Sequence, residues 1–144
     1  MSGIDVITIT DPRYPVALRH SDGAPVVLFL LGARLGRALP GNSIGVVGTR
    51  AASIQICQRA SVIARELVSS GFAVVSGLAL GIDGAAHRGA LEHQCDCPTV
   101  AVLAHGLDMV YPSSHQGLAS RIVASGGLLV SEYPPGTGPL KHHF

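Results

Sequence analysis

The chain has 144 residues, of which 47% are apolar and 13% charged, and its formal net charge is +1. This length suits one domain with a hydrophobic core but is short for a complete doubly wound fold. The near-neutral charge excludes a global field that attracts polyanions, so a nucleic-acid site would have to be a local patch. Because no apolar run could span a membrane and the N-terminus lacks a secretory signal pattern, we expect a cytoplasmic protein without membrane partners.

The N-terminal part, residues 1–24, mixes polar and apolar groups, and two proline-containing pairs interrupt any long element. We expect it to form an arm that packs on the domain through Tyr14 and Leu18. The domain itself is expected over residues 25–144. It starts with an apolar run at 26–31, which is typical of a buried strand.

Residues 43–91 contain two copies of a strand, glycine turn and helix. In the first copy, a strand at 44–47 is followed by the turn Gly48-Thr49-Arg50 and by a helix over 53–70. In the second, a strand at 73–75 leads into Ser76-Gly77, and the loop continues to Gly81. Asp83 is placed to cap a helix that extends to Leu91.

Two more strands are predicted at 99–103 and 128–130, with a helix between them that Ser114 could cap. The high apolar content favours an open, mostly parallel α/β sheet with helices on both faces. In such a sheet the loops at 48–50, 76–83, 105–108 and 131–137 converge on one edge, where α/β sheets bind ligands. All four loops are rich in glycine and polar residues, which favours a binding site.

The Gly48-Thr49-Arg50 turn suits an anion. Helix N-termini offer unpaired N–H groups and partial positive charge, and an arginine can donate two hydrogen bonds to a phosphate. The alternative is that Gly48 only makes a tight turn and that Arg50 is solvated. The glycines match neither the G-x-G-x-x-G nor the Walker A pattern, so no nucleotide cofactor is expected.

Catalysis and metal binding are weaker hypotheses. Asp83 and His87 lie four residues apart on one helix face, and His105, Asp108 and Glu132 could approach them. A capping Asp and a turn-bonding His are commoner than an acid–base pair, so we expect no enzyme. The pair Cys95-x-Cys97 has too short a spacing for a usual zinc site.

The chain resembles the DNA-processing protein A family, also called DprA or Smf. The similar blocks are GVVGTRAAS, GFAVVSGLALGIDGAAHRGAL, TVAVLAHGLDMVYPSSH and LLVSEYPPGTGPLKHHF, in that order. The resemblance implies a Rossmann-like domain that binds single-stranded DNA and helps to load RecA during natural transformation. It also implies a homodimer.

The resemblance further implies that Arg50 and Lys141 hold phosphates and that Phe144 contacts a base. The candidate DNA-binding residues are Gly48, Thr49, Arg50, Ser53, Ser76, Gly77, Gly81, Lys141 and Phe144. No metal and no cofactor are expected. Base preference should be weak, because phosphate contacts and stacking read no base edges.

The family pattern is expected to continue after Phe144, so we expect an incomplete domain whose sheet has an uncovered edge or face. RecA binding and dimerisation by this chain depend on that missing part. Two alternatives remain: a fold fragment without binding ability, and a protein that binds or hydrolyses nucleotides on the similar phosphoribohydrolase fold. The motif PGGxGT-x-x-E of those enzymes is absent, which favours DNA binding.

Overall fold

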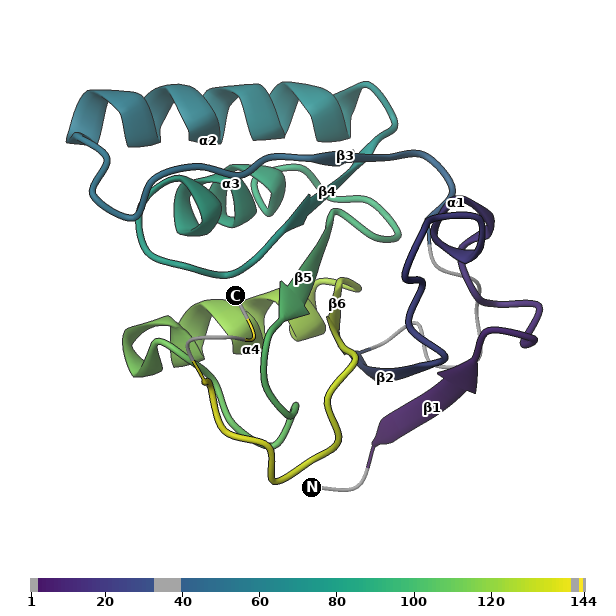
Figure 1. The fold of residues 1–144 in the computed structure, drawn as a ribbon. Helices are drawn as coiled ribbons and strands as arrows, with labels where there is room; N and C mark the ends of the chain where they lie inside the picture. Colours follow the sequence, from purple (N-terminus) through teal and green to yellow (C-terminus); the bar gives the residue numbers. More distant parts are fainter. Residues whose placement is uncertain (1–2, 33–39, 141–142, 144) are drawn as a thin grey trace.

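The computed structural model describes residues 3–32, 40–140 and 143, which form a six-stranded sheet in the order β1-β2-β6-β5-β4-β3 (Figure 1). The strands are β1 (Ile4–Thr8), β2 (Val27–Gly32), β3 (Ser43–Gly45), β4 (Ala73–Ser76), β5 (Thr99–Leu103) and β6 (Leu128–Ser131). The helices are α1 (Val16–Arg19), α2 (Ile54–Ser69), α3 (Ile82–Ala90) and α4 (Gln116–Ala124), and a 3₁₀ turn, η1 (Ser113–His115), precedes α4. The predicted open, mostly parallel α/β sheet is confirmed.

The strands β3, β4, β5 and β6 are parallel neighbours in chain order. Since every crossover steps in the same direction, right-handed connections place α2, α3 and α4 on one face of the sheet. Packing agrees with this, because Val74 of β4 clusters with Val68 of α2, and Leu129 of β6 clusters with Ile122 of α4. The C-terminal ends of the four strands therefore point to the same edge.

The helices α2 and α3 pack unusually closely. Ser53 starts α2 by accepting a hydrogen bond from the Ile56 amide with its hydroxyl (3.4 Å), as expected for an N-cap serine. A Cβ on Gly89 of α3 would lie 2.0 Å from the carbonyl oxygen of Ser61 in α2. Only a glycine permits this close approach of the two helices.

The N-terminal arm is part of the sheet. β1 pairs antiparallel with β2, which pairs antiparallel with β6. The sequence predicted an arm here and no strand. In the structure, only Ile7 of β1 is buried. The anchoring role of Tyr14 is confirmed: the ring is 1% exposed, and its hydroxyl donates to the Pro25 carbonyl (2.6 Å). Leu18 packs partly buried against the same cluster.

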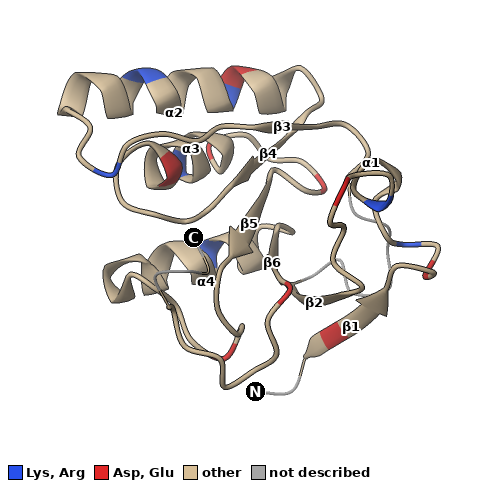
Figure 2. Cartoon of the chain, in the orientation of Figure 1, with Lys and Arg blue, Asp and Glu red and all other residues tan. Residues whose placement is uncertain are grey.

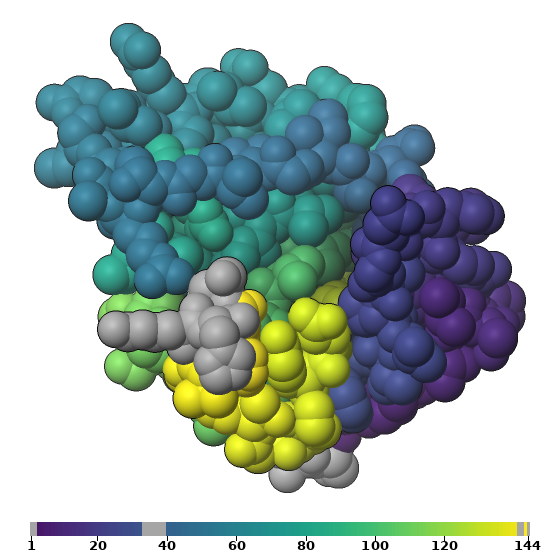
Figure 3. Space-filling model, in the orientation of Figure 1, coloured from purple at the N-terminus to yellow at the C-terminus, as the bar shows by residue number. Residues whose placement is uncertain are grey.

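The described residues cover the second face of the sheet only partly. The single-turn helix α1 and the arm lie over it, and Figure 3 shows this purple N-terminal part as a bulge beside the remainder of the molecule. A groove of about 360 Å³ separates α1 from β4, β5 and β6. Val102 of the central strand β5 is 48% exposed. Among the described residues, helices thus occupy both faces as predicted, but unequally.

Candidate functional site

The loops that follow β3, β4, β5 and β6 meet at one edge of the sheet, as predicted. The loops after β5 and β6 are joined where the Gly106 amide donates to the Thr137 carbonyl (2.8 Å) and the Gly136 amide donates to the Asp108 carboxylate (2.9 Å). We call this edge the rim. It consists of the loops after β3, β4, β5 and β6, at residues 46–53, 77–81, 104–112 and 132–140.

Asp83 joins the first two loops of the rim. It is 7% exposed; its Oδ1 accepts from the Gly48 amide (3.3 Å) and its Oδ2 from the Gly77 amide (3.0 Å). The prediction that Asp83 caps α3 is wrong, because Gly81 occupies the N-cap position and Asp83 lies within the first turn. The carboxylate instead satisfies backbone amides of two loops that precede the helix.

The two glycine turns also touch each other directly. Gly81 has φ +75°, and a Cβ there would lie 2.2 Å from the Thr49 carbonyl oxygen. A Cβ on Gly48 would lie 2.7 Å from Cγ1 of Ile82. Glycine is required at both positions because the loops are so close. The Gly48 amide, expected at an anion, is directed to Asp83 in this structure.

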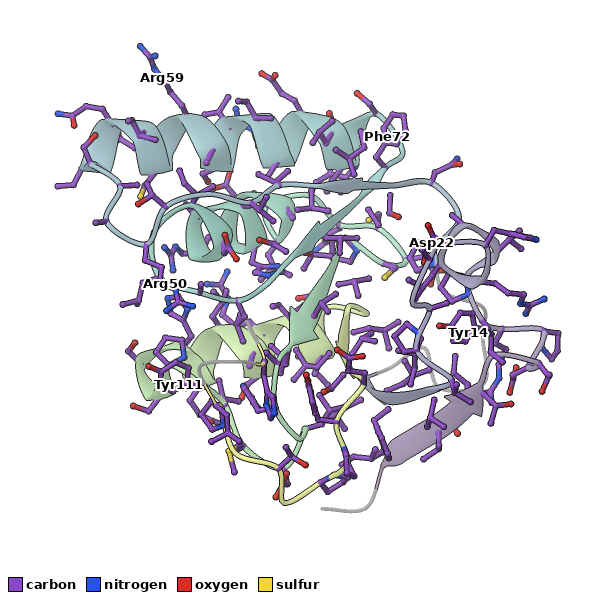
Figure 4. All side chains as sticks on the ribbon, viewed as in Figure 1. Tyr14, Asp22, Arg50, Arg59, Phe72 and Tyr111 are labelled. Atoms are coloured by element: carbon purple, nitrogen blue, oxygen red, sulfur yellow. The ribbon has the colours of Figure 1, made fainter. Side chains whose placement is uncertain are left out.

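A small pocket of about 50 Å³ opens at the rim. It is lined by Arg50, Gly77, Ala79, Leu80, Tyr111 and Pro112. Arg50 is exposed in the loop after β3, and Figure 4 shows its side chain near that of Tyr111, which belongs to the loop after β5. The pocket thus combines one cation with apolar walls and an aromatic ring. Such walls suit a ligand that carries negative charge beside an apolar or aromatic group.

Arg50 and Gly77, both predicted DNA-binding residues, are brought together in this pocket. Ala79 and Leu80 belong to the loop 76–83 that was predicted at this edge, although neither was a candidate contact. Tyr111 and Pro112 were not predicted at the site. Tyr111 lies three residues beyond the predicted loop segment 105–108, so no sequence signal indicated it, and its place beside Arg50 depends on the tertiary structure.

The pocket wall is held by a contact between the loops after β4 and β5. Nδ1 of His115, which is 7% exposed, lies 2.8 Å from the carbonyl oxygen of Leu78. Leu78 has φ 58°, a left-handed conformation that costs a non-glycine residue about 1–2 kcal/mol. Its fully buried side chain and this contact offset the cost. A Cβ on Gly84 would lie 2.6 Å from the His115 ring, so Gly84 makes room for it.

The hydroxyl groups of three candidate DNA-binding residues form hydrogen bonds within the protein. Ser76 is 2% exposed, and its Oγ donates to the Val46 carbonyl (2.6 Å), so the structure places it inside the domain and not at the rim surface. Ser53 caps α2. Thr49 is exposed, and its hydroxyl accepts from the Ala51 amide (3.2 Å). These side chains support the shape of the loops.

Lys141 and Phe144 lie outside the described residues. His143, the described residue between them in the sequence, stacks its ring on Tyr133 with centroids 4.1 Å apart. Nδ1 of His143 also lies 3.2 Å from the Ala104 carbonyl oxygen, at the end of β5. His143 therefore lies at the rim.

Asp83 and His87, the possible acid–base pair, are both buried. His87 is fully buried, and its Nδ1 donates to the Thr99 hydroxyl (2.7 Å), which itself donates to the Val74 carbonyl. Burial lowers the pKa of His87 to about 4, and the backbone of Ser76 offsets this only in part. His87 is thus a neutral core residue at pH 7.

Charges of both signs are interspersed over the layers of the fold (Figure 2). In the part of the chain that the structure describes, no group of three or more His, Cys, Asp or Glu side chains could hold a metal ion. Within the same residues, no helix is long and apolar enough to cross a membrane.

The chain belongs to the DNA recombination-mediator protein A family, whose model matches residues 5–144. It is 49% identical to the putative DNA processing protein DprA of Mycobacterium tuberculosis over 96% of this chain and 38% of that relative. It is 36% identical to DNA processing protein DprA of Bacillus subtilis over 99% of this chain and 46% of that protein. The chain therefore spans less than half the length of these relatives.

Two solved structures share the fold. The X-ray structure of DNA processing protein A from Streptococcus pneumoniae superposes with a TM-score of 0.83 at 38% identity, covering 99% of this chain and 48% of that one. DNA processing protein A from Helicobacter pylori, described for its single-stranded DNA binding mode, superposes with a TM-score of 0.79 at 28% identity. It covers 97% of this chain and 61% of that one.

Proposed function

We propose that this chain binds single-stranded DNA without catalysis, and that Arg50 at the rim pocket holds a backbone phosphate. The observation that carries the proposal is the position of Arg50, exposed on the loop after β3 and lining a pocket with apolar and aromatic walls. A guanidinium offers several donors to phosphate oxygens, and adjacent apolar surface suits the unpaired bases of a single strand. The family match and the single-stranded DNA binding of the Helicobacter pylori relative support this assignment.

The roles of the other candidates follow from their positions. Gly77 lines the pocket beside Arg50, whereas Gly48 and Gly81 shape the loops that present Arg50. Lys141 and Phe144 stay predicted DNA contacts. Loading of RecA, a homodimer and a cytoplasmic location likewise stay predictions for the longer protein of this family.

The alternative of a nucleotide-hydrolysing protein is less favoured. Asp83 and His87, the acid and base that lie four residues apart on α3, are 7% and 0% exposed. Both oxygens of Asp83 already accept backbone hydrogen bonds. This pair is thus buried and does not face a nucleotide bound at the rim surface.

The test is fluorescence anisotropy with a labelled dT oligonucleotide and a matched duplex across a salt series. We expect tighter binding of the single strand and an affinity that falls as salt rises, because phosphate contacts release counterions. Arg50→Ala should weaken binding and reduce the slope of log K against log salt by about 0.7, the value for one phosphate on a single strand.

The matched control is Arg59→Ala. Arg59 is exposed on α2 and points away from the rim in Figure 4. This variant should retain the slope and affinity of the parent protein. If Arg50→Ala and Arg59→Ala behave alike while both remain folded by circular dichroism, the assignment of Arg50 is wrong.

A further inference from the structure

We propose that the ring of Tyr111 is a surface on which a base of the bound strand stacks, next to the phosphate held by Arg50. This inference rests on the proposed function and adds a second kind of contact to the same pocket. Nothing in the sequence pattern had singled out Tyr111 for binding.

The exposure of Tyr111 is the first support. Its side chain is 49% exposed, whereas the other exposed aromatic side chain among the described residues, Phe72, is 38% exposed. Phe72 directly precedes β4 and so lies at the opposite edge of the sheet, and Figure 4 shows the two rings far apart. Among the described residues, Tyr111 is therefore the exposed aromatic residue at the edge where the four loops converge.

The surroundings of the ring are the second support. Leu80, 46% exposed, and Pro112 extend the apolar surface beside Tyr111, while Arg50 lines the same pocket. Each nucleotide of a single strand pairs a flat apolar base with a charged phosphate, and this arrangement of side chains matches both parts. A pocket of about 50 Å³ has room for only a few waters, at about 10–15 Å³ each. The base would therefore lie over the ring and not inside the pocket.

The hydrogen-bonded loop that carries Tyr111 is the third support. The residue after Tyr111 is Pro112, whose carbonyl accepts from the His115 amide (2.9 Å). His115 in turn contacts the Leu78 carbonyl in the neighbouring loop. A tyrosine has only two side-chain torsions, so a ring on such a braced loop loses little freedom when a base stacks on it.

Stacking and phosphate contact have different signatures. Every base has a flat face, so stacking tolerates any sequence, but it requires that a base be present. A phosphate contact depends on salt and does not require a base. The two contributions can therefore be separated with a dT oligonucleotide and an abasic oligonucleotide of the same length.

The experiment compares the parent protein with Tyr111→Ala and Tyr111→Phe by anisotropy on both oligonucleotides across a salt series. We expect Tyr111→Ala to weaken dT binding by about 5- to 140-fold, the range for one stacked base. Its abasic affinity and its salt slope should not change. Tyr111→Phe keeps the ring and should bind dT within about twofold of the parent protein, which also shows that the phenol hydroxyl is not the contact. Phe72→Ala is the matched control and should change neither affinity.

Unchanged dT binding by Tyr111→Ala, or an equal loss on dT and abasic strands, would overturn the stacking assignment. In the first case Arg50→Ala still reports on the proposed function, since it should lower binding to both oligonucleotides. If the folded parent protein binds neither oligonucleotide, the proposed function and this inference fail together.

Discussion

The carboxylate of Asp83 accepts a hydrogen bond from the amide of Gly48, 35 residues earlier in the chain. The other oxygen of the same carboxylate accepts from Gly77. One side chain at the start of α3 thus sets the separation of two rim loops, one of which carries Arg50. The rim is shaped by such internal contacts before any ligand arrives.

Replacing Asp83 should therefore affect both stability and binding. In Asp83→Asn one oxygen becomes an NH₂ group that cannot accept a hydrogen bond, so one backbone amide loses its buried partner. We expect a loss of about 1–3 kcal/mol in the free energy of unfolding, measured with urea, and weaker binding of single-stranded DNA. Asp22→Asn, at an exposed position, should change neither. Equal stability of the two variants would show that the Asp83 contacts do not hold the loops.

The close approach at Gly81 gives a second prediction, with another glycine of positive φ as its control. Gly81 (φ +75°) and Gly71 (φ +89°) both have a positive φ, but a Cβ would lie 2.2 Å from the Thr49 carbonyl oxygen at Gly81 and would meet nothing within 4 Å at Gly71. Gly71→Ala should cost about 1–2 kcal/mol of conformational strain and leave DNA binding unchanged. Gly81→Ala should cost more and weaken binding, because the turn carrying Arg50 must move. Thermal unfolding and anisotropy would show this, and similar behaviour of both variants would contradict it.

The buried His87 predicts a pH dependence of stability. Its pKa is about 4 in the folded protein, against about 6.5 when unfolded, so the folded state binds fewer protons between these values. The stability due to neutral His87 is complete above about pH 6.5. As the pH falls toward 4, the free energy of unfolding should decrease by up to about 1.4 kcal/mol per pH unit. Urea unfolding between pH 4 and 7.5 would measure the slope.

The share of His87 in that slope is isolated by His87→Gln, since the acidic groups titrate alike in both proteins. The variant should show a shallower slope than the parent protein over this range. NMR titration of the imidazole gives an independent readout: a ring that protonates near pH 6.5 in the folded protein would refute the prediction.

The loops after β5 and β6 depend on Ser131. This residue is fully buried, and its hydroxyl donates to the His105 carbonyl (2.8 Å) and accepts from the Tyr133 amide (3.0 Å). Ser131→Ala leaves two buried backbone groups without this partner and should cost about 1–3 kcal/mol. Ser120→Ala removes an exposed hydroxyl that contacts Gln116 in the same helix and should stay within about 0.5 kcal/mol of the parent protein. Hydrogen exchange should show faster exchange at Tyr133 in the first variant alone.

Much of the fold could be predicted from the sequence. The strand at 99–103 coincides with β5, and the helix over 53–70 differs from α2 by one residue at each end. Buried parallel strands are continuous apolar runs, and an amphipathic helix shows its period locally, so neither depends on distant contacts. The position of Arg50 at the convergent edge also follows from the order of strands and helices along the chain.

Other features depended on the tertiary structure. β1 carries too weak a pattern to be recognised without β2 beside it, and Asp83 has the features of a local cap although its partners lie in other loops. The sequence places Ser76 at the rim because it comes at the end of a strand. Its hydroxyl instead donates a hydrogen bond to the Val46 carbonyl in the loop after β3.

The sequence by itself determined the class of fold, the family and the edge at which Arg50 lies, because these follow from local patterns and their order. Only the tertiary structure decided that Tyr111 shares a pocket with Arg50. That pairing joins loops 61 residues apart (111 minus 50), and it depends on the packing of His115 against Leu78, which no local pattern encodes.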